Sequence, residues 1–209
     1  MKTRVLLCGA VALAVMLGSV AAMAQEKGSG KPGTQGDSMS MDAMMQAMAK
    51  YSTPGPAHQL LEKMVGKWSI VVKMWMDPAA PPTESKGTSQ CEMTLGGRWL
   101  REEVRSEFMA QPFVGVGLTG YDNFRQRYVG VWMDNMSTAP MLSLGTVDST
   151  GTIFNFSGTM DEPVTGEKDK EFRNVLRWTG PDQMVSEMYD TIPGKGEIKV
   201  MEITYTRAK

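Results

Sequence analysis

The chain has 209 residues and a formal net charge of −1, with 22 basic and 23 acidic side chains and 1 histidine. This nearly balanced charge gives no electrostatic footprint for nucleic acid or for an anionic membrane surface. The single histidine excludes zinc sites that are built mainly from histidine. Because Cys8 lies in the N-terminal apolar segment, we expect Cys91 to be alone in the folded part, without an internal disulfide.

The N-terminal segment has the pattern of a secretory signal peptide. Two basic residues precede an apolar run over residues 5–22, and Ala22 and Ala24 supply the small residues that precede a cleavage site. An uncleaved membrane anchor is the alternative, and the small residues at the end of the run argue against it. We therefore expect cleavage near Ala24 to remove residues 1–24. The mature chain, with a charge of about −3 and no transmembrane segment, would then be periplasmic or secreted.

Two segments of different composition follow. Residues 25–37 are polar and rich in glycine, which predicts a disordered tether. Residues 38–56 predict a methionine-rich helix and a linker, because Ala, Met and Gln favour a helix and the prolines near residue 55 end it. The methionines that share one face of this predicted helix are Met41, Met44, Met45 and Met48.

The methionine face has two interpretations. Clustered thioethers bind Cu(I), so these four methionines are candidate ligands for copper handling. The alternative is a short amphipathic helix that uses methionine as an adaptable apolar surface. No histidine or cysteine accompanies the cluster, which favours the second interpretation. No other metal site is predicted.

Residues 57–209 have the pattern of a β-barrel domain. A short apolar turn precedes Gly66, and the strand that begins at Trp68 alternates apolar and polar residues. Further strand-like segments follow at regular intervals, with hairpin-length links and no helical crossover. The predicted strands cover residues 68–75, 84–95, 98–109, 112–121, 125–134, 140–147, 152–160, 170–179, 184–191 and 197–207.

The simplest arrangement of these strands is an up-and-down sheet that closes on itself and so removes its edges. A β-sandwich is the alternative, but the regular spacing and the lack of long return links favour the barrel. We expect an all-β fold, an antiparallel barrel of about ten strands of the calycin or lipocalin kind, with a short N-terminal helix. The apolar turn before Gly66 should plug one end of it.

Five short blocks of this domain carry a family resemblance. They are residues 55–58 (GPAH), 61–68 (LEKMVGKW), 96–100 (GGRWL), 120–123 (GYDN) and 201–205 (MEITY). Together they resemble the bacterial domain-of-unknown-function 1579 family over about residues 53–207. The resemblance implies a calycin-like β-barrel, often exported, without an established activity. It assigns no functional residues.

Polar and aromatic side chains on strand faces that are otherwise apolar suggest an internal site. Glu102 shares a face with Leu100 and Val104, and Glu187 shares a face with Tyr189. If these faces point inward, a buried charge must be paired, so the groups form either an internal salt-bridge network or a polar anchor for a ligand. The candidate ligand-binding residues are Arg98, Glu102, Tyr128, Trp132, Glu187 and Tyr189.

Two single residues are further candidates for chemistry. His58 precedes the apolar turn, where it either caps backbone groups or serves in ligand binding or proton transfer. Cys91 has no general base near it in sequence, which favours a buried inert thiol over a nucleophile. No motif assigns a catalytic residue or implies a cofactor.

The sequence favours binding over catalysis. We expect an exported barrel that holds a small apolar or amphipathic molecule in its interior. One alternative is an enzyme that uses the inward carboxylates with Tyr189 or His58, and another is copper handling by the methionine cluster. The small apolar ligand is the only partner that the pattern suggests, and neither its identity nor the oligomeric state can be predicted.

Overall fold

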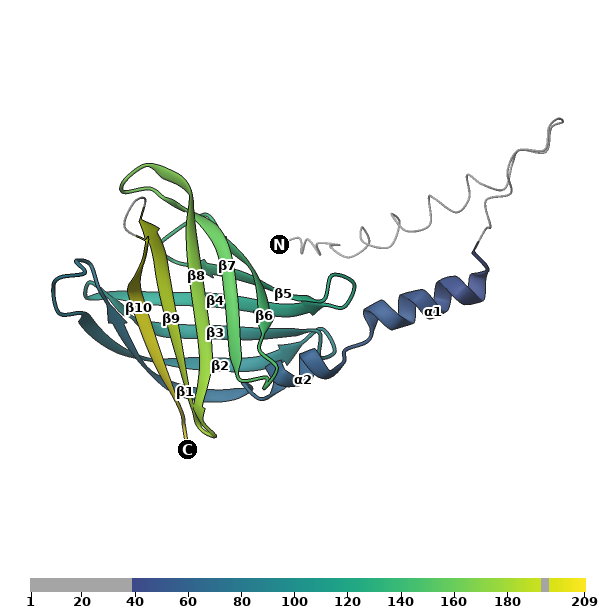
Figure 1. The fold of residues 1–209 in the computed structure, drawn as a ribbon. Coiled ribbons are helices and arrows are strands. Elements are labelled where there is room, and N and C mark those ends of the chain that lie inside the picture. The colour runs from purple at the N-terminus through teal and green to yellow at the C-terminus, as the bar shows by residue number, and fades with distance from the viewer. Residues whose placement is uncertain (1–38, 193–195) are drawn as a thin grey trace, which may run out of the picture. The chain divides into compact units, whose positions relative to one another are not determined.

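The computed structural model describes residues 39–192 and 196–209 (Figure 1). The predicted signal peptide, residues 1–24, and the predicted tether, residues 25–37, lie outside the described residues. No helix in the described ranges is long and apolar enough to cross a membrane.

Ten antiparallel strands form a closed barrel, which confirms the predicted fold. Each strand pairs with its neighbours in the chain, and β1 closes the barrel against β10 from Trp68 opposite Arg207 to Met74 opposite Met201. This order needs only hairpin links and leaves no free sheet edge. The strands are β1 (Gly66–Met74), β2 (Thr83–Thr94), β3 (Trp99–Phe108), β4 (Gln111–Asp122), β5 (Arg127–Asp134), β6 (Met141–Val147), β7 (Ile153–Glu162), β8 (Glu167–Gly180), β9 (Gln183–Ile192) and β10 (Gly196–Arg207).

Two helices precede the barrel, α1 (Met41–Ser52) and α2 (Pro56–Glu62). Proline at the first position of α2 suits the helix, since its missing N–H would have no partner there. The backbone N–H of Gly55 donates to Nδ1 of His58 at 3.0 Å, and the histidine side chain is buried. Burial, followed by the charge of Arg98, lowers the pKa of His58, so the ring is a neutral acceptor at pH 7. The predicted capping role of His58 is confirmed.

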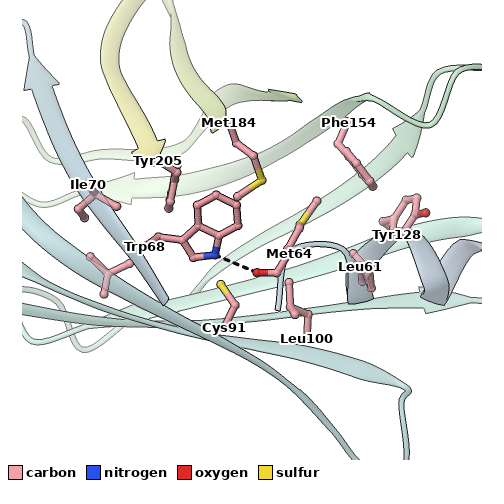
Figure 2. Close-up of a cluster of buried hydrophobic side chains, with 11 residues drawn as sticks. Leu61, Met64, Trp68, Ile70, Cys91, Leu100, Tyr128, Phe154, Met184 and Tyr205 are labelled. Carbon is pink, nitrogen blue, oxygen red and sulfur yellow. Dashed lines mark hydrogen bonds between the residues drawn. The ribbon is translucent and has the colours of Figure 1, made fainter. Parts of the chain in front are cut away.

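The apolar turn closes one end of the barrel, as predicted. Leu61 and Met64 are buried against Trp68, the first large inward side chain of β1 (Figure 2). The Trp68 indole Nε1–H donates to the Met64 carbonyl at 2.9 Å, which fixes the ring across the barrel floor. The Tyr205 ring meets it edge-on at 6.4 Å between centroids, and the Arg207 guanidinium lies over its face at 4.2 Å. We call this closed end the plug.

Candidate internal binding site

The barrel interior beyond the plug contains a cavity of about 230 Å³. Inward side chains from most of the strands line it, and the wall is predominantly apolar. A cavity of about 150 Å³ lined by apolar side chains holds a benzene molecule, so this one has room for a somewhat larger compound. The cavity reaches from Met64 of the plug to Met141 and Met188 on strands β6 and β9.

Glycines on the inner face of the wall leave this space. Gly117 of β4 and Gly130 of β5 contribute bare backbone to the cavity. The indole of Trp132 covers β4 so closely that a Cβ on Gly115 would lie 2.2 Å from its Cζ2 atom. Phe156 covers Gly145 in the same way, at 2.5 Å from Cδ1. Flat aromatic rings therefore lie along the wall where side chains are missing, and the centre stays hollow.

Sulfur-containing side chains make up much of the lining. They come from the plug and from strands β2, β6, β9 and β10, and are Met64, Cys91, Met141, Met184, Met188 and Met201. Thioethers are flexible and polarisable, and they make favourable contacts with aromatic rings. The wall can therefore adapt to planar apolar ligands of different shapes.

Glu102 of β3 is the acidic group of this cavity. Its Oε1 accepts a hydrogen bond of 2.7 Å from the Ser89 hydroxyl, and the Tyr205 hydroxyl also interacts with the carboxyl. Burial raises the pKa of Glu102, and the two hydroxyl groups oppose this rise only in part. Within the described part of the chain, no cation forms an ion pair with Glu102. It is an internal carboxyl that two hydroxyl groups orient and that lacks a countercharge.

The neighbouring titratable groups stay neutral at pH 7. Burial, with a smaller effect of Glu102, raises the pKa of Cys91 to about 12. Burial and Glu102 likewise raise the pKa of Tyr205 well above its ordinary value. A thiol with so high a pKa is a poor nucleophile, which agrees with the inert role predicted for Cys91.

Two further polar groups lie inside the barrel. The Ser186 hydroxyl of β9 donates to Oδ1 of Asn174 on β8 at 2.8 Å, and both residues line the cavity. Lys170 alternates in phase with the inward residues of β8, and it forms an ion pair with the buried Asp190. This pair lies toward the end opposite the plug.

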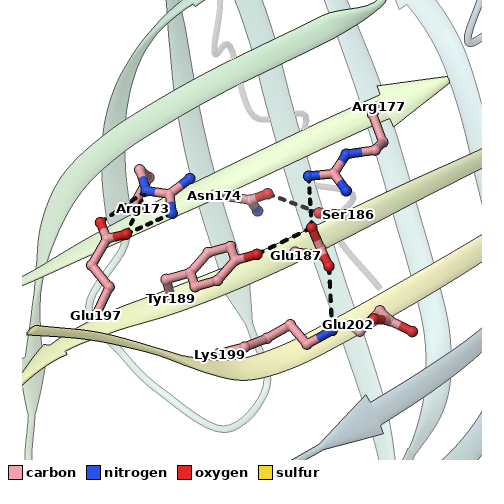
Figure 3. Close-up of polar contacts among 9 residues, drawn as sticks. All are labelled: Arg173, Asn174, Arg177, Ser186, Glu187, Tyr189, Glu197, Lys199 and Glu202. Carbon is pink, nitrogen blue, oxygen red and sulfur yellow. Dashed lines mark hydrogen bonds and ion pairs between the residues drawn. The ribbon is translucent and has the colours of Figure 1, made fainter.

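The inward orientation predicted for Glu187 and Tyr189 is wrong. Met184, Ser186 and Met188 of β9 line the cavity, so the residues between them point to the outer surface. Figure 3 shows Glu187 and Tyr189 on the opposite side of the ribbon from Ser186. Both faces of this strand carry apolar and polar side chains, so the sequence pattern does not distinguish inside from outside.

On the outer surface Glu187 is the centre of an ion-pair network (Figure 3). Its carboxylate lies 2.7 Å from Nη2 of Arg177 and 3.2 Å from Nζ of Lys199, and it accepts from the Tyr189 hydroxyl at 3.2 Å. Burial alone would raise the pKa of Glu187, but Lys199, Arg177 and Tyr189 together hold it below its usual value. Lys199 also pairs with Glu202 at 2.5 Å. This carboxylate is satisfied by protein groups.

Arg98 lies in the β2–β3 hairpin at the plugged end, outside the cavity. Its Nη1 donates to the carbonyl oxygens of Leu95 and Gly96 at 3.2 and 3.4 Å. Tyr128 points inward but belongs to the plug, where its hydroxyl donates to the Ala57 carbonyl at 3.0 Å. The structure therefore brings only Glu102 and Trp132 together at the cavity, out of the six candidates.

Comparison with known proteins agrees with this architecture. The sequence profile described as "Protein of unknown function (DUF1579)" matches residues 53–207. The chain belongs to this family. A search of curated protein sequences finds no match.

Two solved structures resemble this DUF1579 barrel. Rv2717c from M. tuberculosis is 13% identical with a TM-score of 0.54, and the match covers 75% of this chain and 100% of that one. The S-type phycobiliprotein lyase CPES from Guillardia theta is 15% identical with a TM-score of 0.53, over 73% of this chain and 92% of that one. At these identities the similarity shows the fold alone.

The sequence pattern does not identify several cavity residues of this DUF1579 member as part of the site. Ser89, Asn174, Ser186 and Tyr205 line or adjoin the site, and Ser89 contacts the carboxyl directly. The inward direction of Trp68 could have identified them, because residues opposite each other on paired strands point to the same side of the sheet. The β1–β10 register therefore shows which residues of β10 point inward. The β10–β9 register does the same for β9, apart from one shift between Lys199 and Met201.

The methionine-rich segment forms the predicted helix α1. The four methionines of the shared face have exposed side chains, and no residue of α1 is buried. Its C-terminal end contacts the β4–β5 turn, where Nδ2 of Asn123 donates to the carbonyls of Tyr51 and Thr53. Copper binding by this face stays a prediction.

Proposed function

We propose that the protein binds a small apolar or amphipathic molecule inside its barrel. The observation that carries this proposal is the cavity of about 230 Å³, which combines an apolar wall with a few oriented polar groups. That combination is typical of small-molecule sites. The polar groups are paired by hydrogen bonds from Ser89 to Glu102 and from Ser186 to Asn174, so their positions are fixed before a ligand arrives.

Catalysis by two inward carboxylates receives no support, because Glu187 lies on the outer surface while Glu102 lies inside. The similar barrel from Guillardia theta is named a lyase. Fold similarity does not transfer an activity, however, and sites on one fold differ widely in chemistry. Binding is therefore the function that the internal geometry supports best.

Native mass spectrometry of protein purified from its own host tests the proposal. We expect the mass of the polypeptide plus a small molecule that is released when the protein is denatured. A clean mass of the polypeptide alone, under conditions that keep the barrel folded, would contradict it.

Two neighbouring substitutions on β9 provide a matched control. Ser186→Phe places a bulky ring in the cavity, whereas Val185→Phe places the same ring on the outer surface. We expect the first to abolish the bound mass and the second to retain it. Circular dichroism checks that both variants fold. If Ser186→Phe does not fold, Met188→Trp, which narrows the same cavity, takes its place.

We also propose that the protein is exported, on the basis of its N-terminal sequence. The expected result is an intact mass that begins at Gln25, recovered from the periplasm or the medium. A full-length chain beginning at Met1 in the cytoplasmic fraction would contradict export, without bearing on ligand binding.

A further inference from the structure

We propose that the ligand is a small arylalkyl amine, whose ammonium group pairs with Glu102 and whose ring lies among the methionine and aromatic side chains of the cavity. This inference rests on the proposed binding function and specifies the chemical class of the ligand. Three features of the site carry it: the carboxyl without a countercharge, the indole of Trp132 in the same cavity, and the sulfur-rich wall.

Among the described residues, the Glu102 carboxyl has no positive partner. Arg207 lies close enough to act on Cys91, the residue opposite Glu102, but it pairs with Asp182 at 3.1 Å. Lys170, on the inner face of β8, pairs with Asp190. Ser89 and Tyr205 contribute only hydroxyl groups to Glu102. A buried carboxylate without a cation is costly, so a ligand that supplies one gains an ion pair that the protein lacks.

An aromatic ring lies in the same part of the cavity as Glu102. A Cβ on Gly117 would lie 3.3 Å from Cε3 of Trp132 and 3.8 Å from Cβ of Glu102. The indole and the base of the Glu102 side chain therefore lie next to one stretch of bare backbone, while the carboxyl itself is held by Ser89 and Tyr205. A ligand whose ammonium group pairs with this carboxyl can place its ring against the indole.

The rest of the wall suits a ring more than an alkyl chain. Phe156 and Phe172 line the cavity together with the five methionines and Cys91. Thioether sulfur contacts aromatic rings favourably. The volume of about 230 Å³ exceeds the roughly 150 Å³ that holds one benzene, so it fits a ring system with a short polar arm.

The affinity for an amine at Glu102 should depend on pH. The titratable groups that face this carboxyl are Cys91 from β2 and Tyr205 from β10, and both are neutral at pH 7. The facing residue of β4 is Gly117, which has no side chain. Only the ionised carboxyl pairs with the ammonium group, so amine affinity should rise with pH through the raised pKa of Glu102. Above that pKa the affinity should stay constant until the amine itself loses its proton at alkaline pH.

Three ligands with the same ring test the inference: naphthylmethylamine, naphthalenemethanol and naphthoic acid, titrated into the purified protein by calorimetry. We expect the amine to bind roughly tenfold more tightly than the alcohol, and the acid most weakly. In Glu102→Gln the amine and the alcohol should bind within about threefold of each other, because the charge is gone and the shape is kept. The matched control Glu103→Gln, whose parent carboxylate pairs with Arg101 and Arg105 on the outer surface, should keep the tenfold preference.

The outcomes separate the two proposals. Equal binding of amine and alcohol to the native protein, tighter binding of the acid, or an unchanged preference in Glu102→Gln would overturn the amine inference and leave cavity binding intact. Absence of binding by all three ligands would overturn the amine inference, while native mass spectrometry of protein from its own host decides the proposed binding function separately. Should Glu102→Gln fail to fold, the ranking of the three ligands on the native protein decides, since an amine that binds no more tightly than the alcohol contradicts the inference.

Discussion

Glu102 and Glu187 show how the surroundings of a glutamate set its pKa. Glu102 lies inside the barrel with hydroxyl partners, and its pKa is raised by burial. Glu187 lies on the outer surface with two cations, which outweigh the effect of burial and lower its pKa. The first carboxyl is uncompensated, and the second is part of a structural network. This difference leads to opposite pH effects on stability.

The unmodified protein should lose stability as pH rises because of Glu102, and Glu102→Gln should not show this loss. The folded protein holds the Glu102 proton above pH 4.5, where the unfolded chain releases it, so the native protein loses stability from about pH 4.5 up to the raised pKa. Gln keeps the shape and still accepts from Ser89. Urea unfolding at several pH values should show that the free energy of unfolding of the unmodified protein decreases relative to that of the variant across this pH range. A constant difference would mean that the Glu102 carboxyl is not perturbed by burial.

Glu187→Gln should destabilise the protein at neutral pH by about 1–3 kcal/mol. The reason is that Arg177 then loses the charge of its partner, a carboxylate that is largely buried beneath the surrounding side chains. The lowered pKa of Glu187 means that its contribution is complete above pH 4.5 and is lost as pH falls through the folded value. The free energy of unfolding measured at pH 7 and near pH 3 checks both statements. Glu92→Gln is the control, since that exposed pair with Arg101 at 3.6 Å contributes less than about 1 kcal/mol.

At the scale of elements, strands β4 to β7 are shaped by rings that cover glycines. Trp132 lies against Gly115 and Gly117, and Phe156 lies against Gly145. A side chain at any of these positions would push a ring toward the centre of the cavity. The hollow interior therefore depends on the pairing of bare backbone with an aromatic side chain on the adjacent strand.

Gly115→Ala tests this pairing. The added Cβ would lie 2.2 Å from the Trp132 ring, so the indole must move and the barrel should lose about 1–3 kcal/mol of stability. The tryptophan fluorescence emission of the protein should shift as the surroundings of Trp132 change. Gly180→Ala is the control, because no heavy atom lies within 4 Å of a Cβ there. Equal stability of the two variants would show that the ring does not rely on the bare backbone.

Strand β9 also shows where prediction from sequence ends. The sequence places Glu187 and Tyr189 on the face opposite Met184 and Met188, but it does not determine which face points inward. The alternation of side chains along a strand defines two faces, but it does not show which face points into the barrel. Only the register through β10 to Trp68 decides it, and that register is a property of the closed sheet.

At the scale of the whole molecule, most of the fold could be predicted. Regular strand spacing, hairpin links and the apolar turn before Gly66 indicate a closed barrel with one plugged end, and the structure has both. These features are local in sequence. The cavity could not be predicted, because its volume depends on how inner glycines and rings from separate strands meet. The lack of an ion-pair partner for Glu102 among residues 39–192 and 196–209 is likewise a property of the assembled interior.

Methionine methyl NMR offers the most direct test of ligand binding inside the barrel. Protein with labelled methionine methyl groups would be titrated with naphthylmethylamine, and shifts would be compared between two sets of residues. The cavity set is Met64, Met141, Met184, Met188 and Met201, and the exposed set is Met39, Met44, Met45 and Met48. We predict shifts in the cavity set and none in the exposed set. Shifts confined to the exposed set, or no shifts at saturating ligand, would contradict binding inside the barrel.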